Sequence, residues 1–160
     1  MTRTYLLTIL LGIIPISELR GAIPYAYFNG VPLWLSAVIG VLSNATVPFF
    51  GFLFLNSIHK VLDRWHVYHN FFEKTVERAR RNVGEKVSKY GLLGLMLFVA
   101  IPLPITGAWT GTLGAWVLGL DRKKSILFIL LGVLVAGIIV TTVIYTGAGI
   151  ASLFTKRIDI

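Results

Sequence analysis

The chain has 160 residues, which suits a single domain, and it is unusually apolar. Hydrophobic residues make up 56% of the sequence and charged residues only 14%, against about 25% charged residues in a typical soluble domain. With a mean hydropathy of +0.79 and no cysteine, this composition excludes disordered, collagen-like and disulfide-stabilised proteins and indicates a membrane protein.

Four hydrophobic blocks follow one another along the chain, and together they predict an all-α integral membrane protein. The blocks cover Thr4–Phe28, Leu33–Asn56, Gly91–Leu120 and Ser125–Phe154. A transmembrane helix needs about 20 mostly apolar residues. The second and fourth blocks meet this requirement without an acidic or basic residue in their interior, so each predicts one transmembrane helix.

The first block is interrupted by a polar stretch between two prolines. The apolar run Tyr5–Ile14 is followed by the sequence ISELRGAIP. A helix of ten residues is only about 15 Å long, half of a bilayer core. We therefore expect Pro15, Gly21 and Pro24 to divide this block into the two half-helices of a re-entrant hairpin. A single proline-kinked span is the alternative.

The third block has the same organisation. The apolar run Leu92–Ile101 is followed by PLPITGAWTGTLG. Pro102, Pro104 and Gly107 are the expected helix breaks here, which predicts a second re-entrant hairpin.

The two halves of the chain resemble each other, with a hairpin followed by a full span in each. Short identities support the alignment, such as Ile14-Pro15 with Ile101-Pro102. Because a hairpin returns to its own side and the next helix crosses, the second half must start on the opposite side, which gives an inverted repeat. We interpret residues 1–160 as one membrane domain, with repeat one at 4–56, an amphipathic basic loop at 57–90 and repeat two at 91–154.

The net charge of +8 is concentrated between the hydrophobic blocks. Eight basic residues lie within Asn56–Tyr90 and three more within Asp121–Lys124. By the positive-inside rule the central loop is cytoplasmic and both termini are outside, in a multi-pass protein of the cell membrane. Apolar residues of the loop recur at helical spacing, which predicts an amphipathic helix lying on the inner leaflet or a helix pair beneath the membrane domain. This stripe also argues against a nucleic-acid partner.

Glu18 and Arg20 are the two charged residues inside the first block. A charged side chain at the centre of a membrane helix costs about 2.5–3.5 kcal/mol on insertion scales, so such residues are usually functional. We expect them at the hairpin tip, with Glu18 exchanging a proton or holding a cation and Arg20 binding an anion or neutralising Glu18. The alternatives are a structural ion pair or charges at the membrane interface.

Further polar groups lie in or near the two breaks. A half-helix beginning near Gly21 or Gly107 would point its first N–H groups into a cavity and favour an anion. The other candidate binding residues are Ser17, Asn44, Thr106, Trp109 and Thr110. For Asn44, helix packing is the alternative role. The sequence has no nucleotide, metalloprotease or hydrolase motif, so we expect no enzyme, cofactor or metal.

The strings ISELRGAIPYA and PLPITGAWTGTLGAW, in a chain of this length, resemble the putative small multidrug export family. The resemblance covers essentially the whole chain and implies an integral membrane protein that exports small molecules. A looser resemblance to DedA-type membrane proteins implies paired re-entrant hairpins and lipid-carrier transport, although the second hairpin here has no charged residue.

The predicted function is secondary, ion- or proton-coupled export of small molecules, with binding between the hairpin tips. The alternatives are translocation of a lipid carrier or phospholipid headgroup and a non-transporting membrane scaffold. The expected partners are the lipid bilayer, a small-molecule or lipid substrate and a second copy of the chain, because four blocks enclose little volume.

Overall fold

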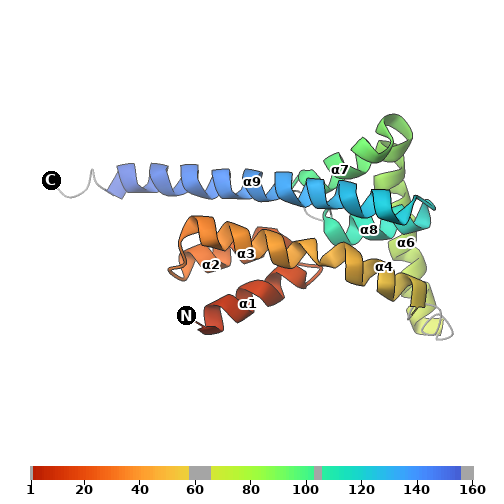
Figure 1. Ribbon diagram of the computed structural model, residues 1–160, viewed down its shortest axis with the longest axis horizontal. Helices are drawn as coiled ribbons and strands as arrows, with labels where there is room; N and C mark the ends of the chain where they lie inside the picture. The colour runs from red at the N-terminus through yellow and green to blue at the C-terminus, as the bar shows by residue number, and fades with distance from the viewer. Residues whose placement is uncertain (1, 58–65, 103–105, 156–160) are drawn as a thin grey trace.

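The computed structural model describes residues 2–57, 66–102 and 106–155, and in these ranges the chain forms helices and no strand (Figure 1). The helices are α1 (Thr2–Ile13), α2 (Glu18–Phe28), α3 (Leu33–Ala45), α4 (Val47–Ser57), α6 (His66–Tyr90), α7 (Leu92–Ala100), α8 (Ala108–Val117) and α9 (Arg122–Thr155). The predicted all-helical fold is therefore confirmed for the described residues.

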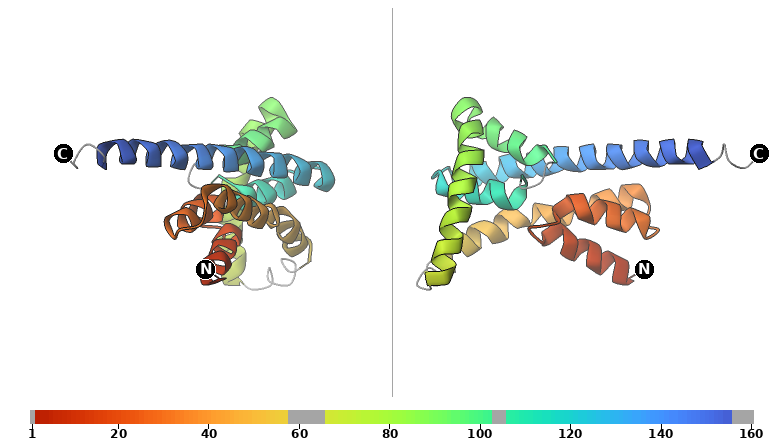
Figure 2. Two further views of the ribbon diagram at one scale, coloured as in Figure 1. Left: turned by 60° about the vertical axis from the view of Figure 1, so that its left-hand side comes forward. Right: turned by 180° about the vertical axis from the view of Figure 1, so that it is seen from behind.

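Helices α1 and α2 pack side by side, so the chain runs toward the middle of the molecule and back (Figures 1 and 2). Helix α1 ends where Ile14 precedes Pro15, and the ring of a proline disfavours helical backbone in the residue before it. The predicted interruption of the first block is present, and it spans residues 14–17.

Two of the predicted helix breaks in this pair are wrong. Gly21 and Pro24 both lie inside α2. The chain turns earlier, at Pro15 and at Glu18, whose positive φ of 49° is left-handed backbone. No second turn is needed afterwards, and a proline within an apolar helix can be accommodated when neighbouring groups satisfy the freed carbonyl.

The second hydrophobic block forms α3 and α4, which follow each other with only Thr46 between them. Together they give an apolar helical segment of 25 residues, Leu33–Ser57, long enough to cross a membrane. The fourth block forms the second such segment within the described residues, Arg122–Gly147 of α9, with 26 residues.

Helix α6 lies across one end of the molecule, transverse to the length of α9 (Figures 1 and 2). It confirms the predicted amphipathic helix over His66–Tyr90, while the part of the stripe at 58–65 is outside the described residues. The buried side chains of Ala79 and Val83 face α7 and α8, and the basic residues Lys74, Arg78, Arg81 and Lys89 are exposed. The helix therefore packs on the bundle with its apolar face and presents a basic face outward.

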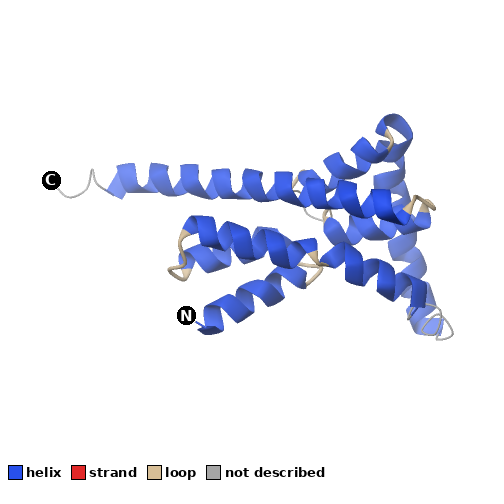
Figure 3. Ribbon diagram, viewed as in Figure 1, coloured by secondary structure: helices blue, strands red, loops and turns tan. Residues whose placement is uncertain are grey.

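Helices α7 and α8 run from the α6 end toward the middle and back, so the second predicted interruption is also present (Figure 3). Helix α7 ends at Ala100, and Ile101 follows it with extended backbone before Pro102. Helix α8 begins after Gly107, and Pro104 lies outside the described residues.

Helix α9 packs mainly against α7 and α3 and holds the two halves together. Close packing of this helix depends on small residues. At Gly132 an added Cβ would lie 2.7 Å from the carbonyl oxygen of Met96 in α7, so a larger side chain does not fit there. The α1–α2 and α7–α8 turns consequently meet near the middle of the molecule, having approached from opposite ends (Figure 1).

Candidate functional site

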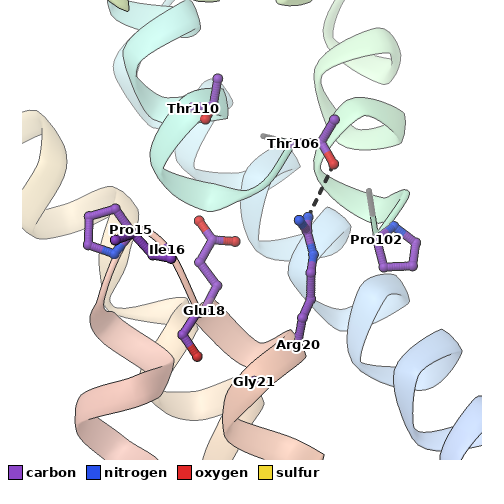
Figure 4. A pocket seen from close by; sticks show the side chains of 9 residues that line it. Pro15, Ile16, Glu18, Arg20, Gly21, Pro102, Thr106 and Thr110 are labelled. Atoms are coloured by element: carbon purple, nitrogen blue, oxygen red, sulfur yellow. Dashed lines mark hydrogen bonds between the residues drawn. The ribbon is translucent and has the colours of Figure 1, made fainter. Parts of the chain in front are cut away.

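A cavity of about 670 Å³ lies where the two interruptions meet (Figure 4). Its walls come from both turns and from the first residues of α2 and α8. The lining residues are Pro15, Ile16, Ser17, Glu18, Arg20, Gly21, Pro102, Thr106 and Thr110. The structure thus brings Ser17, Glu18, Arg20, Thr106 and Thr110, all candidates from the sequence, to one place.

The carboxylate of Glu18 caps the N-terminus of α8. Its Oε1 accepts a hydrogen bond from the backbone N–H of Trp109 at 3.1 Å, and its Oε2 accepts one from the backbone N–H of Ala108 at 3.3 Å. These are the first N–H groups of α8, which have no partner inside the helix, and the positive end of the helix dipole favours a carboxylate there. Glu18 is only 5% exposed, so these bonds give a buried carboxyl group its hydrogen-bond partners.

The contact between Glu18 and α8 requires glycine at position 107. Gly107 has φ 155° and ψ −170°, a combination that is essentially restricted to glycine. A Cβ at this position would also collide with the carboxylate of Glu18. Gly107 therefore lies directly before α8, close to the predicted start of this helix, and leaves room for the capping carboxylate.

Arg20 reaches the other part of the second turn. Its Nη2 donates to Thr106 Oγ1 at 3.2 Å, and Thr106 Oγ1 in turn donates to the carbonyl oxygen of Ile101 at 2.7 Å (Figure 4). That carbonyl belongs to the end of α7, where the helix stops before Pro102. Both charged residues of α2 therefore bind the second turn, Glu18 at its α8 side and Arg20 at its α7 side.

The C-terminus of α1 is held by two side chains from other helices. Asn44 Nδ2 in α3 donates to the carbonyl oxygen of Gly12 at 2.9 Å, and Trp109 Nε1 in α8 donates to the carbonyl oxygen of Ile13 at 2.6 Å. Carbonyl groups in the last turn of a helix have no partner within the helix, so these bonds satisfy them. Asn44 and Trp109 do not line the cavity, and they fix the turn that forms one of its walls.

Some of the remaining predicted residues line the central cavity and others do not. Pro15, Gly21 and Pro102 line it, and Gly107 lies next to the carboxylate of Glu18 without lining it. Pro24 lines a neighbouring cavity, which Arg20 also lines. Sequence reasoning missed Ile16, which is 96% exposed at the tip of the first turn. Its position directly after the predicted helix break at Pro15 was the sequence signal that could have placed it in the turn.

The arrangement suits binding of an anion better than binding of a metal. The carboxylate of Glu18 is directed to the N-terminus of α8, while the guanidinium of Arg20 lies on the cavity wall. Among the described residues, no three His, Asp or Glu side chains are grouped so that they could hold a metal ion.

These features define a helical protein with two apolar segments long enough to cross a membrane and a cavity lined by two charged residues. The chain belongs to the family described as putative small multi-drug export protein, whose model matches residues 18–139. The matched region contains Glu18, Arg20 and the whole second turn, and the family description indicates a transporter rather than an enzyme. Searches of curated proteins and of solved structures give no match. The looser resemblance to DedA-type proteins stays a prediction.

Proposed function

We propose that the chain is a secondary exporter whose substrate binds in the cavity between the two turns. The observation that carries this proposal is that both charged residues of α2 lie on the cavity wall and bind opposite sides of the second turn. Charged groups inside a membrane domain usually mark the path of a substrate or an ion. Membership of the export family supports the same conclusion.

The two helix pairs are interpreted as re-entrant hairpins of an inverted repeat. Their turns approach each other from opposite ends, while the Leu33–Ser57 and Arg122–Gly147 segments are long enough to span a bilayer. Helices of 9 to 12 residues, such as α1 and α7, cover only about half of the hydrocarbon core. Irregular backbone at that depth is tolerated when it lines a cavity.

The orientation follows from the distribution of charge. Helix α6 and the exposed residues Arg122, Lys123 and Lys124 lie at the same end of the molecule, and the positive-inside rule assigns this end to the cytoplasm. The chain is then a multi-pass protein of the cell membrane, with both termini outside. The proposal also includes a single membrane domain, with repeat one at 4–56, the basic loop at 57–90 and repeat two at 91–154. It further includes assembly of the chain as a homodimer.

Coupling is assigned to Glu18. The ionised carboxylate holds the N-terminus of α8 against α2, and a proton on it removes the charge that the helix dipole favours. The two helix pairs can then separate on one side of the cavity. Proton binding and the opening of the cavity are linked in this way, which is the requirement for proton-coupled export.

The test is dye export from vesicles of neutral phosphatidylcholine that contain the full chain. Ethidium serves as the cationic probe and sulforhodamine B as the anionic probe, each with and without a pH gradient. We expect at least one dye to leave faster than from protein-free vesicles, and faster still with the gradient. The effect of the gradient disappears in Glu18→Gln and persists in Glu85→Gln, an exposed control on α6. The proposal is contradicted if both dyes leave the vesicles only as fast as they leave protein-free vesicles. It is also contradicted if the pH gradient still accelerates export in Glu18→Gln.

A membrane scaffold is the second candidate, and the exposed basic face of α6 favours it. In that case Glu18→Gln and Arg20→Ala leave the cellular function intact. Replacement of Lys74, Arg78, Arg81 and Lys89 by glutamine abolishes it. The export proposal predicts the opposite pattern.

A further inference from the structure

A second cavity adjoins the central one at Arg20. It has a volume of about 400 Å³, and Arg20, Pro24 and Pro102 form the wall nearest the turns. The opposite wall consists of four apolar residues of α9, Ile139, Val140, Val143 and Ile144. Arg20 and Pro102 also line the central cavity, so the two spaces share a boundary.

The two cavities differ in chemistry. The central cavity is lined by the hydroxyl groups of Ser17, Thr106 and Thr110 and by both charged side chains. In the cavity beside α9, Arg20 is the one lining residue with a polar side chain. A guanidinium group presents several N–H donors in a planar fork that matches carboxylate and phosphate groups. Arg20 therefore lies at the boundary between a polar and an apolar space.

The apolar cavity faces the region where lipid would lie. Val143, which lines this cavity, is 63% exposed, so the cavity lies at the surface of α9 beside α2. A molecule that occupied both spaces would have its charged group at Arg20 and its apolar part against α9.

We propose that the two cavities form one binding site for an amphipathic anion, with its anionic group at Arg20 and its apolar chain along Ile139–Ile144 of α9. This inference rests on the proposed export function and names the chemical class of the substrate. Cations of the same shape are disfavoured, because the carboxylate of Glu18 is directed to α8 and the charge at the boundary is that of Arg20. The anionic amphiphile could be a membrane lipid or a free molecule.

The experiment measures equilibrium binding of radiolabelled dodecyl phosphate to the full chain in phosphatidylcholine nanodiscs, corrected for empty nanodiscs. Dodecyl trimethylammonium has the same chain with a positive charge, and inorganic phosphate has the anionic group without a chain. We expect saturable binding of dodecyl phosphate at least tenfold tighter than that of either comparison probe. Equal affinity for the cation or for inorganic phosphate overturns the proposal.

Variants separate the two parts of the site. Arg20→Gln weakens binding of dodecyl phosphate at least tenfold, and Val140→Trp or Val143→Trp does so by filling the apolar cavity. Leu134→Trp is the matched control, since Leu134 is a 51% exposed residue of the same helix outside this cavity. Because Val143 is exposed, its variant is expected to fold even where the half-buried Val140 variant does not. If every tryptophan variant that folds binds dodecyl phosphate as tightly as the unchanged protein, the placement of the ligand's apolar chain along α9 is overturned.

A final arm distinguishes the two sources of the anion. Phosphatidic acid is added to the nanodiscs before titration with dodecyl phosphate. Competition by phosphatidic acid supports the site and identifies a lipid, whereas undiminished binding supports the site and identifies a free amphiphile. If the chain exports dye but binds dodecyl phosphate no more tightly than the two comparison probes, this inference alone is refuted. Selective binding without any export refutes the proposed function alone.

Discussion

The Oε1 atom of Glu18 accepts a hydrogen bond from the backbone N–H of Trp109 at 3.1 Å, across 91 residues of sequence. The indole of Trp109 returns a bond to the same turn, from Nε1 to the carbonyl oxygen of Ile13 at 2.6 Å. Each of these residues satisfies a helix end in the opposite half of the chain, which explains how two short helix pairs are held turn to turn.

Removing the charge of Glu18 should loosen this contact. Glu18→Gln keeps the size of the side chain and loses the charge at the N-terminus of α8, which is worth about 1–2 kcal/mol in a partly buried geometry. In a chain of this size the apparent Tm should fall by about 2–8 °C. Thermal unfolding in detergent measures this, with the exposed Glu85→Gln as control. An unchanged Tm in Glu18→Gln would mean that the capping contact contributes nothing.

Gly107→Ala should destabilise the protein more than alanine at another glycine with positive φ. At Gly107 a Cβ meets the carboxylate of Glu18 in addition to the unfavourable backbone, whereas at Gly119, with φ 66°, nothing lies within 4 Å of an added Cβ. We expect a loss of about 1 kcal/mol for Gly119→Ala and several kcal/mol for Gly107→Ala.

A double variant separates the two contributions at Gly107. In a Glu18→Ala background the collision is absent and only the backbone strain remains, so Gly107→Ala should be less destabilising there. Additive losses measured by thermal unfolding in the single and double variants would contradict direct contact between these residues.

The bond from Trp109 to α1 predicts a local effect. Trp109→Phe leaves the carbonyl oxygen of Ile13 without its donor, at a loss of about 1–3 kcal/mol. Hydrogen exchange of the amides in the last turn of α1 should become roughly 5- to 150-fold faster. Trp116→Phe is the matched control, because its indole donates to Asn56 Oδ1 near the α6 end. Equal acceleration in the two variants would show that the bond at Ile13 is not specific.

How far the sequence predicted the site can be seen at particular residues. Glu18 and Arg20 were identifiable because charges in an apolar block are costly, and Gly107 because a glycine followed two prolines. Gly21 and Pro24 were misread, since a proline and a glycine do not end a helix when the chain has already turned at Pro15 and Glu18.

The partners of the charged residues could not be predicted. The sequence indicated an anion site at the beginning of α8, but nothing in it shows that Glu18 occupies this place, because the contact joins residues 91 positions apart. The apolar wall contributed by α9 was equally hidden. Helix α9 is apolar on every side over most of its length, so hydrophobic periodicity cannot single out the face with Ile139–Ile144.

The proposed orientation predicts opposite labelling of the two ends of the molecule. The chain has no cysteine, so single-cysteine variants report one position each. Ser88→Cys on the exposed face of α6 should react with a membrane-impermeant thiol reagent only in inside-out vesicles. Asn29→Cys, in the exposed α2–α3 connection, should react only in intact cells. The reverse pattern would place α6 outside.

The central claim, a water-filled cavity between the two turns at membrane depth, is tested most directly by labelling Thr110→Cys in vesicles with a charged, impermeant thiol reagent. Two controls are Thr112→Cys, which is only 1% exposed two residues further along α8, and Leu134→Cys, which is 51% exposed among apolar residues of α3 and α9 outside the central cavity. The account predicts that the cysteine at 110 reacts and that those at 112 and 134 do not. An unreactive cysteine at 110, or one at 134 that reacts equally fast, would contradict it.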